Sequence, residues 1–340
     1  MTRNVALLGA SGYTGRLVAA ELARREIDHR LGGRSADRLA QVPSTGVRHV
    51  VDITDPDSLD RFLDGVDVLI TCVGPFAQHG MPVVEAAART GTPYVDSTGE
   101  FAFMGEVFAR FRDAATPIVP ACGFDYIPGD LAAAIAVEEL GGSAEEIDVL
   151  YRLRAGKPSR GTARSAIGAL GSASLTPRRI VVEGPDGPLS AVEVPWGERV
   201  TVPLHVPGAQ VRSGIVAPDA FTRAAALAAP LAALTNPLTR AATPLLNKLV
   251  DRMKEGPDEE TRGKAESLVV AEARRGSRSA RVAVECRDAY GLTARLLVEA
   301  SQQIGGTGAM ATAEALSPRS FLDAVSGSDH NGELSWRVLP

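Results

Sequence analysis

The sequence predicts an α/β protein with a Rossmann-type, doubly wound parallel sheet and a second α+β domain whose sheet is mixed or antiparallel. Two observations predict this fold. Short apolar runs alternate with helical patterns through the first 140 residues, which is typical of a parallel sheet covered on both faces. After about Gly141 the pattern changes to strands, Gly/Pro turns and a hairpin around Arg275-Gly-Ser277.

The chain of 340 residues is long enough for two domains, each with a buried core. We expect the first domain over residues 1–140 and the second over 141–304, with the segment 305–340 returning to the first. Strands of the first domain are predicted at 4–8, 29–32, 47–53, 66–73, 93–96 and 117–121, and helices near 14–25, 56–63, 80–90, 103–114 and after Pro128. Later elements are predicted as strands at 148–154, within 179–202, at 267–274, 278–287 and 334–338, and as helices at 292–304 and 312–325.

Composition excludes several classes of function. The formal net charge is −5, and no basic run with interleaved aromatics occurs, so no nucleic-acid partner is expected. The three cysteines are widely spaced and the histidines scattered, which predicts a reducing cytoplasm, no disulfide framework and no metal site.

No signal peptide or transmembrane segment is expected. The N-terminal apolar run of about five residues is too short for a signal sequence. The Ala/Leu-rich region 220–253 is interrupted by prolines and basic residues, so it offers no uninterrupted apolar span. We interpret it as helices that are packed within the protein or form a homodimer, with an interfacial helix that contacts a membrane peripherally as the alternative.

The glycine-rich turn after the first apolar run predicts a dinucleotide site. Gly9 allows the tight turn, Gly12 lets the backbone approach phosphates, and Gly15 lets the following helix pack closely on the strand. The helix N-terminus then faces the anion. The residues between these glycines that are also predicted to bind the cofactor are Ser11, Tyr13 and Thr14.

The end of the second strand favours NADP(H) over NAD(H). An acidic residue usually holds the ribose 2′-hydroxyl of NAD there. In this chain Arg34 can pair with a 2′-phosphate and Ser35 can donate a hydrogen bond to it. The alternative is that Arg34 is a solvated loop residue.

Two further strand ends are candidates for the cofactor. Asp52 follows the third strand and is placed to meet the adenine amine. The fourth strand ends near the nicotinamide ribose, where Gly74 permits close approach and Pro75 fixes the exit of the loop. Ordinary turn chemistry is the alternative for these positions. The predicted contacts at the fourth strand are Val73, Gly74, Pro75 and Phe76.

Several motifs together resemble the saccharopine dehydrogenase-like reductases, most closely the branch with trans-acting enoyl reductases. They are Gly9–Gly15, Gly32–Ser35, Val73–Gly80, Tyr94–Glu100, Ala121–Asp130 and Asp288–Ala294. The resemblance implies an NADP(H)-linked oxidoreductase with a Rossmann domain and an inserted sheet domain often used for dimerisation. It carries over the cofactor residues but no amino-acid substrate, because the candidate cations form no matching pattern: Arg152, Arg154, Lys157, Arg160 and Arg164.

Catalytic groups are expected where strands end. Tyr126 can donate a proton, and Asp125 can orient it or a water molecule. The alternative is that Asp125 caps the helix after Pro128 and Tyr126 packs as a half-buried aromatic. Asp96 and Glu100 are interpreted as a polar rim or as caps of the 103–114 helix.

These observations predict an NADPH-dependent reductase of a polarised double bond, with an enoyl C=C preferred. The substrate is expected to be a small or lipid-like molecule, and a synthase is a candidate partner. A C=N reductase or amino-acid dehydrogenase is the first alternative. A non-catalytic NADPH-binding scaffold or sensor is the second.

Overall fold

The computed structural model describes residues 2–154, 157–160, 163, 178–224, 249–250, 252–327 and 334–340. These residues form two compact units. The first comprises Met1–Ile127 and Tyr290–Ser317, and the second comprises Pro128–Ala289 and Pro318–Pro340. Most of the segment 156–174 and most of the predicted helices at 220–253 lie outside the described residues.

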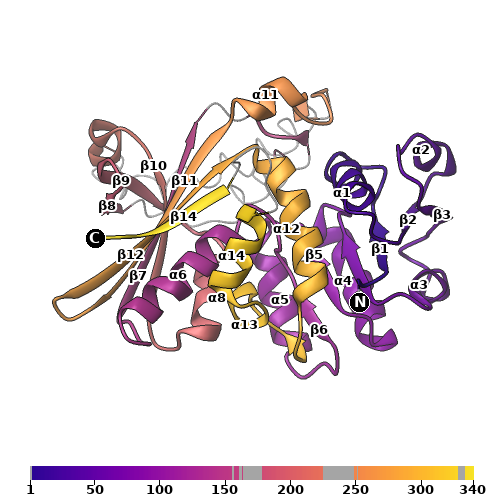
Figure 1. The fold of residues 1–340 in the computed structure, drawn as a ribbon, viewed down its shortest axis with the longest axis horizontal. Coiled ribbons are helices and arrows are strands. Elements are labelled where there is room, and N and C mark those ends of the chain that lie inside the picture. Colours follow the sequence, from indigo (N-terminus) through magenta and orange to yellow (C-terminus); the bar gives the residue numbers. More distant parts are fainter. Residues whose placement is uncertain are drawn as a thin grey trace. The chain divides into compact units, whose positions relative to one another are not determined.

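The first unit contains a seven-stranded parallel sheet with the order β13-β6-β5-β4-β1-β2-β3 (Figure 1). The chain runs outward from β1 to β3 on one side and from β4 to β6 on the other, so the order reverses between β1 and β4. Ligands of open α/β sheets bind outside the carboxyl ends of strands at such a reversal. The strands are β1 (Val5–Leu8), β2 (His29–Gly33), β3 (Val47–Val50), β4 (Val68–Thr71), β5 (Tyr94–Asp96), β6 (Pro117–Val119) and β13 (Gly308–Ala309).

Every residue of β1, β4, β5 and β6 is buried, which explains their continuous apolar sequence. Helices alternate with these strands, as the periodicity predicted, and the doubly wound fold is confirmed. They are α1 (Tyr13–Arg24), α2 (Ala36–Ala40), α3 (Pro56–Leu63), α4 (Phe76–Thr90), α5 (Phe101–Phe111), α12 (Ala289–Gln303) and α13 (Thr312–Ala315).

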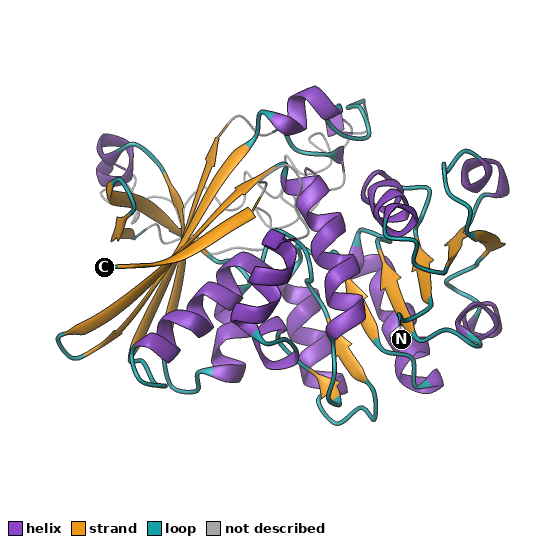
Figure 2. Cartoon of the chain, viewed as in Figure 1, coloured by secondary structure: helices purple, strands orange, loops and turns teal. Residues whose placement is uncertain are grey.

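The second unit contains a seven-stranded mixed sheet with the order β14-β12-β11-β7-β10-β9-β8 (Figure 2). Only β7 and β10 pair in parallel; the other pairs are antiparallel. The strands are β7 (Glu146–Arg154), β8 (Arg179–Gly184), β9 (Gly187–Val194), β10 (Gln210–Val216), β11 (Glu266–Arg275), β12 (Arg278–Arg287) and β14 (Leu334–Leu339). The helices of this unit that the described residues give in full are α6 (Ile127–Glu139), α8 (Glu198–His205), α11 (Glu259–Gly263) and α14 (Pro318–Gly327). The predicted second α+β domain and the hairpin β11–β12 are confirmed.

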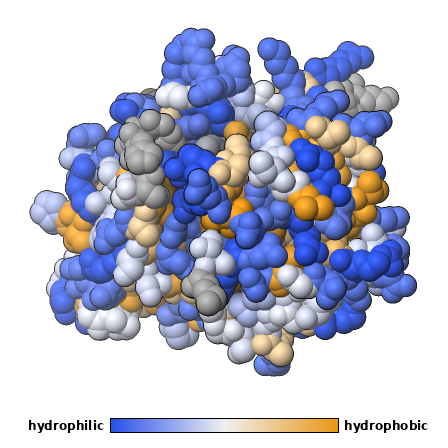
Figure 3. Space-filling model, turned by 45° about the vertical axis from the view of Figure 1, so that its right-hand side comes forward, coloured by the Kyte–Doolittle hydropathy of each residue, from blue (hydrophilic) through white to orange (hydrophobic). Residues whose placement is uncertain are grey.

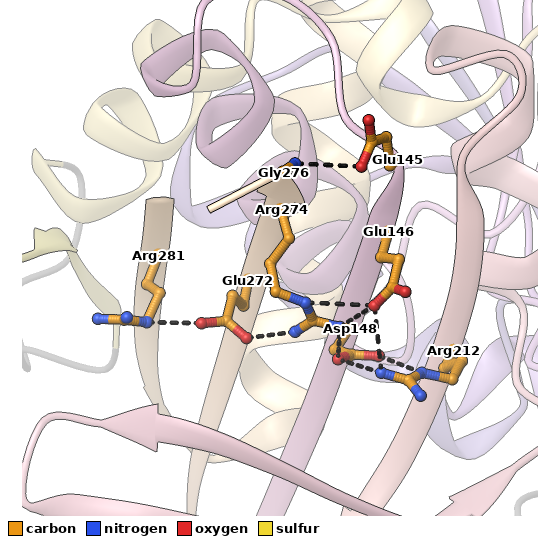
Figure 4. Close-up of polar contacts among 8 residues, drawn as sticks. All are labelled: Glu145, Glu146, Asp148, Arg212, Glu272, Arg274, Gly276 and Arg281. Atoms are coloured by element: carbon orange, nitrogen blue, oxygen red, sulfur yellow. Dashed lines mark hydrogen bonds and ion pairs between the residues drawn. The ribbon is translucent and has the colours of Figure 1, made fainter. Parts of the chain in front are cut away.

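A charged ladder crosses four strands of the second sheet (Figure 4). It consists of Arg212 on β10, Glu146 and Asp148 on β7, Glu272 and Arg274 on β11, and Arg281 on β12. Arg274 lies at its centre, because its guanidinium donates to Glu146 and Asp148, both at 2.6 Å, and to Glu272. The Asp148 side chain is 1% exposed, so its charge depends on these cations for compensation.

Two elements of the second unit differ from the sequence prediction. Residues 198–205 form the helix α8 where short strands are predicted, and β10 is an additional strand. The β-branched residues of α8 favour a strand locally. The helix forms because its first residue, Glu198, is completely buried and accepts hydrogen bonds from Tyr151 and Ser213. Tertiary packing therefore overrides local propensity here.

The C-terminal tail is divided between the two units. Its first part joins the first sheet, since β13 pairs with β6 in parallel. Its last part does not return to that sheet as predicted for 305–340, because β14 pairs with β12 of the second sheet. The chain also leaves the first unit at Ile127 rather than at residue 140, since α6 belongs to the second unit.

Within the described residues, no helix is long and apolar enough to cross a membrane. On the face drawn in Figure 3, hydrophilic residues cover most of the surface, and hydrophobic residues form small separate patches.

We expect Arg274→Ala to lower the free energy of unfolding by about 2–3 kcal/mol, because it removes one of the two arginines that pair with each of the buried carboxylates Asp148 and Glu272. Arg89→Ala is the matched control, since the Arg89–Asp60 pair is about half exposed and such pairs contribute about 0–1 kcal/mol. Urea denaturation of both variants measures the difference. Equal effects would mean that the ladder does not stabilise the second sheet.

Candidate active site

The predicted glycine turn is tightly packed, and two of its glycines are required by space. Gly9 has φ +82°, and a Cβ there would lie 2.9 Å from the carbonyl carbon of Cys72. A Cβ on Gly15 would lie 2.1 Å from the carbonyl oxygen of Gly9. Larger residues at these positions would therefore push β1, α1 and the end of β4 apart.

The N-terminus of α1 is built to receive an anion. Its N-cap is Gly12, and no side chain among the described residues caps it. Its first turn, which includes Tyr13 and Thr14, carries no acidic residue. Backbone N–H groups and the helix dipole at such an end attract phosphate.

The end of β2 is joined to the glycine turn. The carbonyl of Gly32 accepts hydrogen bonds from the amides of Gly9 at 2.9 Å and Ala10 at 3.1 Å. The next residues after the strand bring no carboxylate. Arg34 is exposed and Ser35 caps α2, its hydroxyl accepting from the amide of Arg38 at 3.4 Å. A 2′-phosphate would meet a cation and a hydroxyl at this strand end.

The structure adds two arginines that the sequence analysis missed. The guanidinium of Arg16 on α1 donates to the carbonyl of Ser11 at 3.0 Å, and that of Arg38 on α2 donates to the same oxygen at 3.2 Å. Both positive charges therefore lie beside the glycine turn. The sequence signal for Arg38 was its position four residues after Arg34, one turn into a helix that was not predicted.

Asp52 lies after β3, next to the end of β2, since the amide of Val51 donates to Gly33 at 3.0 Å. Its exposed carboxylate accepts from the hydroxyl and amide of Thr54 at 2.7 and 2.9 Å. These hydrogen bonds lower the pKa of Asp52 below its ordinary range. The carboxylate thus stays ionised and holds its own turn, and its contact with adenine stays a prediction.

The end of β4 packs against the glycine turn. A Cβ on Gly9 would lie 3.0 Å from Cγ2 of Val73, so the two predicted cofactor segments are brought together. The side chain of Phe76 points elsewhere: it is 5% exposed and its ring lies 5.6 Å from that of Phe103. Burial raises the pKa of Cys72 to about 12, which argues against a reactive thiolate.

Asp96 joins the ends of β5 and β6. Its buried carboxylate accepts from the hydroxyl of Tyr94 at 2.6 Å and from the amides of Thr98 at 2.9 Å and Ala121 at 2.7 Å. Ala121 has φ +62°, a conformation that few non-glycine residues adopt. Burial raises the pKa of Asp96 to about 6. Asp96 therefore links the loop after β5 to the loop after β6 through buried hydrogen bonds.

Glu100 caps a helix, but not the 103–114 helix for which capping was considered. Its carboxylate accepts from the amides of Phe76 at 3.0 Å and Ala77 at 2.9 Å, at the N-terminus of α4. This distant cap explains why α4 begins at Phe76 rather than at the predicted residue 80.

Asp125 and Tyr126 follow β6. The Tyr126 hydroxyl donates to the carbonyl of Gly99 at 2.9 Å, and the residue is 2% exposed. The Asp125 carboxyl packs against the same glycine, since a Cβ on Gly99 would lie 2.7 Å from Oδ2. Burial raises the pKa of Asp125 to about 6. The raised pKa brings the titration of Asp125, one of the two predicted catalytic residues, closer to neutral pH.

The start of α12 contacts both the glycine turn and the loop after β6, all within the first unit. The hydroxyl of Thr293 accepts from the amide of Phe124 at 3.1 Å. The ring of Tyr290 meets that of Tyr13 edge to face, with centroids 5.2 Å apart. The glycine turn and the loop after β6 are thereby held by one helix.

These features fit a dinucleotide phosphate. The uncapped end of α1 suits the pyrophosphate, and Arg34 with Arg38 suits a 2′-phosphate. Among the described residues, no group of three or more His, Cys, Asp and Glu side chains could hold a metal ion.

We expect Arg34→Ala and Arg38→Ala each to weaken NADPH binding about tenfold or more, since a charge-assisted contact to phosphate is lost. NADH binding should change little. Fluorescence titration with both cofactors measures this, with Arg61→Ala on α3 as the control. Equal losses for NADPH and NADH would contradict the assignment of a 2′-phosphate contact.

Asp125 also predicts a pH dependence of stability. Its folded pKa of about 6 exceeds the ordinary 3.8, so folding takes up a proton between these values. Its contribution is fully present below about pH 4 and is lost as the pH rises through about 6. The free energy of unfolding of Asp125→Asn, taken relative to that of the parent, should therefore rise by up to about 3 kcal/mol between pH 4 and pH 7. Urea denaturation across this range measures the gain, and the exposed Asp57→Asn should show none. A constant difference between Asp125→Asn and the parent would contradict the shift.

Comparison with known proteins agrees with this geometry. Residues 5–117 match the family model described as the saccharopine dehydrogenase NADP binding domain. A trans-acting enoyl reductase from Mycobacterium leprae is 38% identical over 141 residues, which are 38% of this chain and 34% of the relative. A saccharopine dehydrogenase-like oxidoreductase from Mus musculus is 28% identical over 197 residues, 49% of this chain and 46% of the relative. The matches therefore span about a third to a half of these relatives.

A solved saccharopine dehydrogenase (L-Glu forming) from Saccharomyces cerevisiae has the same fold. It aligns with a TM-score of 0.64 at 16% identity and covers 99% of this chain and 100% of its own. Residues 5–117 therefore match the saccharopine dehydrogenase NADP binding domain, and NADP(H) is the cofactor of such a domain.

Proposed function

We propose that the protein is an NADPH-dependent reductase of a polarised double bond, with an α,β-unsaturated carbonyl compound as the preferred acceptor. The relative from Mycobacterium leprae supports the enoyl reaction through its name and its 38% identity. In this reaction the β-carbon of the acceptor gains a hydride and the α-carbon gains a proton. The C=C bond becomes a single bond, and NADPH becomes NADP⁺.

The observation that carries the proposal is the protonatable carboxyl of Asp125 at the carboxyl edge of the parallel sheet. Its pKa of about 6 lets it hold a proton and release it near neutral pH, as a general acid must. The hydroxyl of Tyr126 is engaged with the carbonyl of Gly99. We therefore assign proton donation to the α-carbon to Asp125, while the role predicted for Tyr126 stays a prediction.

The cofactor residues keep their predicted roles in this proposal. The backbone of Gly9–Gly15 and the end of α1 would hold the pyrophosphate, and Arg34 and Ser35 would hold the 2′-phosphate, with Arg38 added by the structure. The backbone of Val73–Pro75 would border the nicotinamide ribose. NADPH, when bound, supplies the hydride.

The cations considered for an amino-acid substrate do not favour the first alternative, a C=N reductase. Arg160 donates to the carbonyl of Met253 at 2.6 Å, and Arg152 lies 3.9 Å from Asp186. Arg164 lies outside the described residues. We retain two proposals for partners: a second copy of this chain, and a synthase that presents the acceptor, which the word trans-acting in the relative's name supports. A small or lipid-like substrate and a cytoplasmic location also remain proposals.

Oxidation of NADPH with a panel of enoyl thioesters, enones and imines tests the reaction. We expect turnover with an enoyl acceptor and a loss of kcat of about 10²-fold or more in Asp125→Asn, because the proton donor is removed. Asp57→Asn should retain the parent rate. Turnover with imines alone would support the C=N reductase, and NADPH binding without any turnover would support the scaffold.

A further inference from the structure

The helices α1 and α4 both begin at the carboxyl edge of the parallel sheet, but their N-termini differ in one respect. The end of α1 has no side-chain cap among the described residues. The N-terminus of α4 is instead capped by a side chain of the protein, that of Glu100. The four orphan amides of a helix N-terminus usually attract anions, so this difference decides where an anionic group can bind.

The N-cap of α4, Pro75, has no N–H, and the three orphan amides that follow it all have partners. Phe76 and Ala77 donate to the two carboxylate oxygens of Glu100 at 3.0 and 2.9 Å. Gln78 and His79 donate to the carbonyl of Pro75, both at 3.1 Å. A bound anion would have to displace the Glu100 carboxylate and would meet its negative charge.

The loops around this helix end add no positive charge from Lys or Arg. The segments 72–80, 97–101 and 120–127 contain neither residue. They contain the carboxyl groups of Glu100 and Asp125, and the buried Asp96 lies directly before the second segment. The arginines of the site, Arg34 and Arg38, belong to the other half of the sheet edge, beside β2. This charge distribution favours the cofactor phosphates on the β2 side and disfavours an anion on the β4–β6 side.

We propose that Glu100 determines acceptor specificity: by filling the N-terminus of α4 it restricts the reaction to uncharged carbonyl acceptors, such as esters and thioesters, and excludes free carboxylates. The inference rests on the proposed function, since it concerns the acceptor of that reaction. The acceptor lies on the β4–β6 side because the 2′-phosphate residues occupy the β2 side and the dinucleotide crosses between the two halves.

The first test uses inorganic phosphate and needs no turnover. The holoprotein with NADP⁺ bound is titrated with phosphate, and the backbone amide resonances of Phe76 and Ala77 are followed by NMR. The parent protein should show no saturable shift at these amides. Glu100→Gln should show one, because the neutral amide oxygen can accept from only one of the two amides. Glu106→Gln on α5 is the matched control and should behave as the parent. A saturable shift in the parent, or none in a folded Glu100→Gln, would overturn the proposal.

The second test uses the parent enzyme, so it does not depend on how Glu100→Gln folds. An enoyl thioester and the corresponding free enoate are compared as acceptors. We expect kcat/KM to favour the thioester by about tenfold or more, and Glu100→Gln to reduce that preference. Equal use of the two forms would overturn the proposal. If no acceptor is reduced, the proposed reaction fails, while the phosphate titration still decides the role of Glu100.

Discussion

The buried carboxylate of Asp96 is the interaction on which the rest of the cofactor edge depends. It joins two strand ends that are 25 residues apart in the chain and stabilises Ala121 in an unusual backbone conformation. The loop that starts at Asp96 then carries Gly99, which accepts from Tyr126, and Glu100, which caps α4. Loss of this one carboxylate would release the ends of β5 and β6 and the start of α4 together.

The two units compensate buried charge in different ways. In the first, Asp96 accepts hydrogen bonds from a hydroxyl and from backbone amides, and burial raises its pKa to about 6. Glu198 in the second unit is similar: Tyr151 and Ser213 donate to it, and burial raises its pKa to about 7. The charged ladder instead surrounds Asp148 with Arg212 and Arg274. Neutral donors thus accompany the two buried carboxyls whose pKa is raised, whereas in the ladder arginines supply the opposite charge.

The fold and the cofactor turn could be predicted because their signals are local. Gly9, Gly12 and Gly15 lie within one turn, and Arg34 directly follows its strand. The start of α4 could not be found in this way, since its cap, Glu100, comes 24 residues after Phe76. The helix α8 was missed because its anchor, Glu198, is fixed by side chains from β7 and β10. The tail was only partly predicted, because nothing in residues 334–339 encodes which of two sheets they join.

The interleaving of the two units has a consequence for synthesis on the ribosome. The chain passes between the units at Ile127, Ala289 and Ser317, so each unit is assembled from separated segments. The nucleotide-binding unit receives α12 and β13 only after almost all of the second unit has been translated. The second sheet receives its edge strand β14 only when residues 334–339 have been translated. Domains encoded by one continuous segment can fold in order as they emerge. Here the first sheet is completed by β13 and the second by β14, so neither sheet has all of its strands until residue 308 or later has been translated.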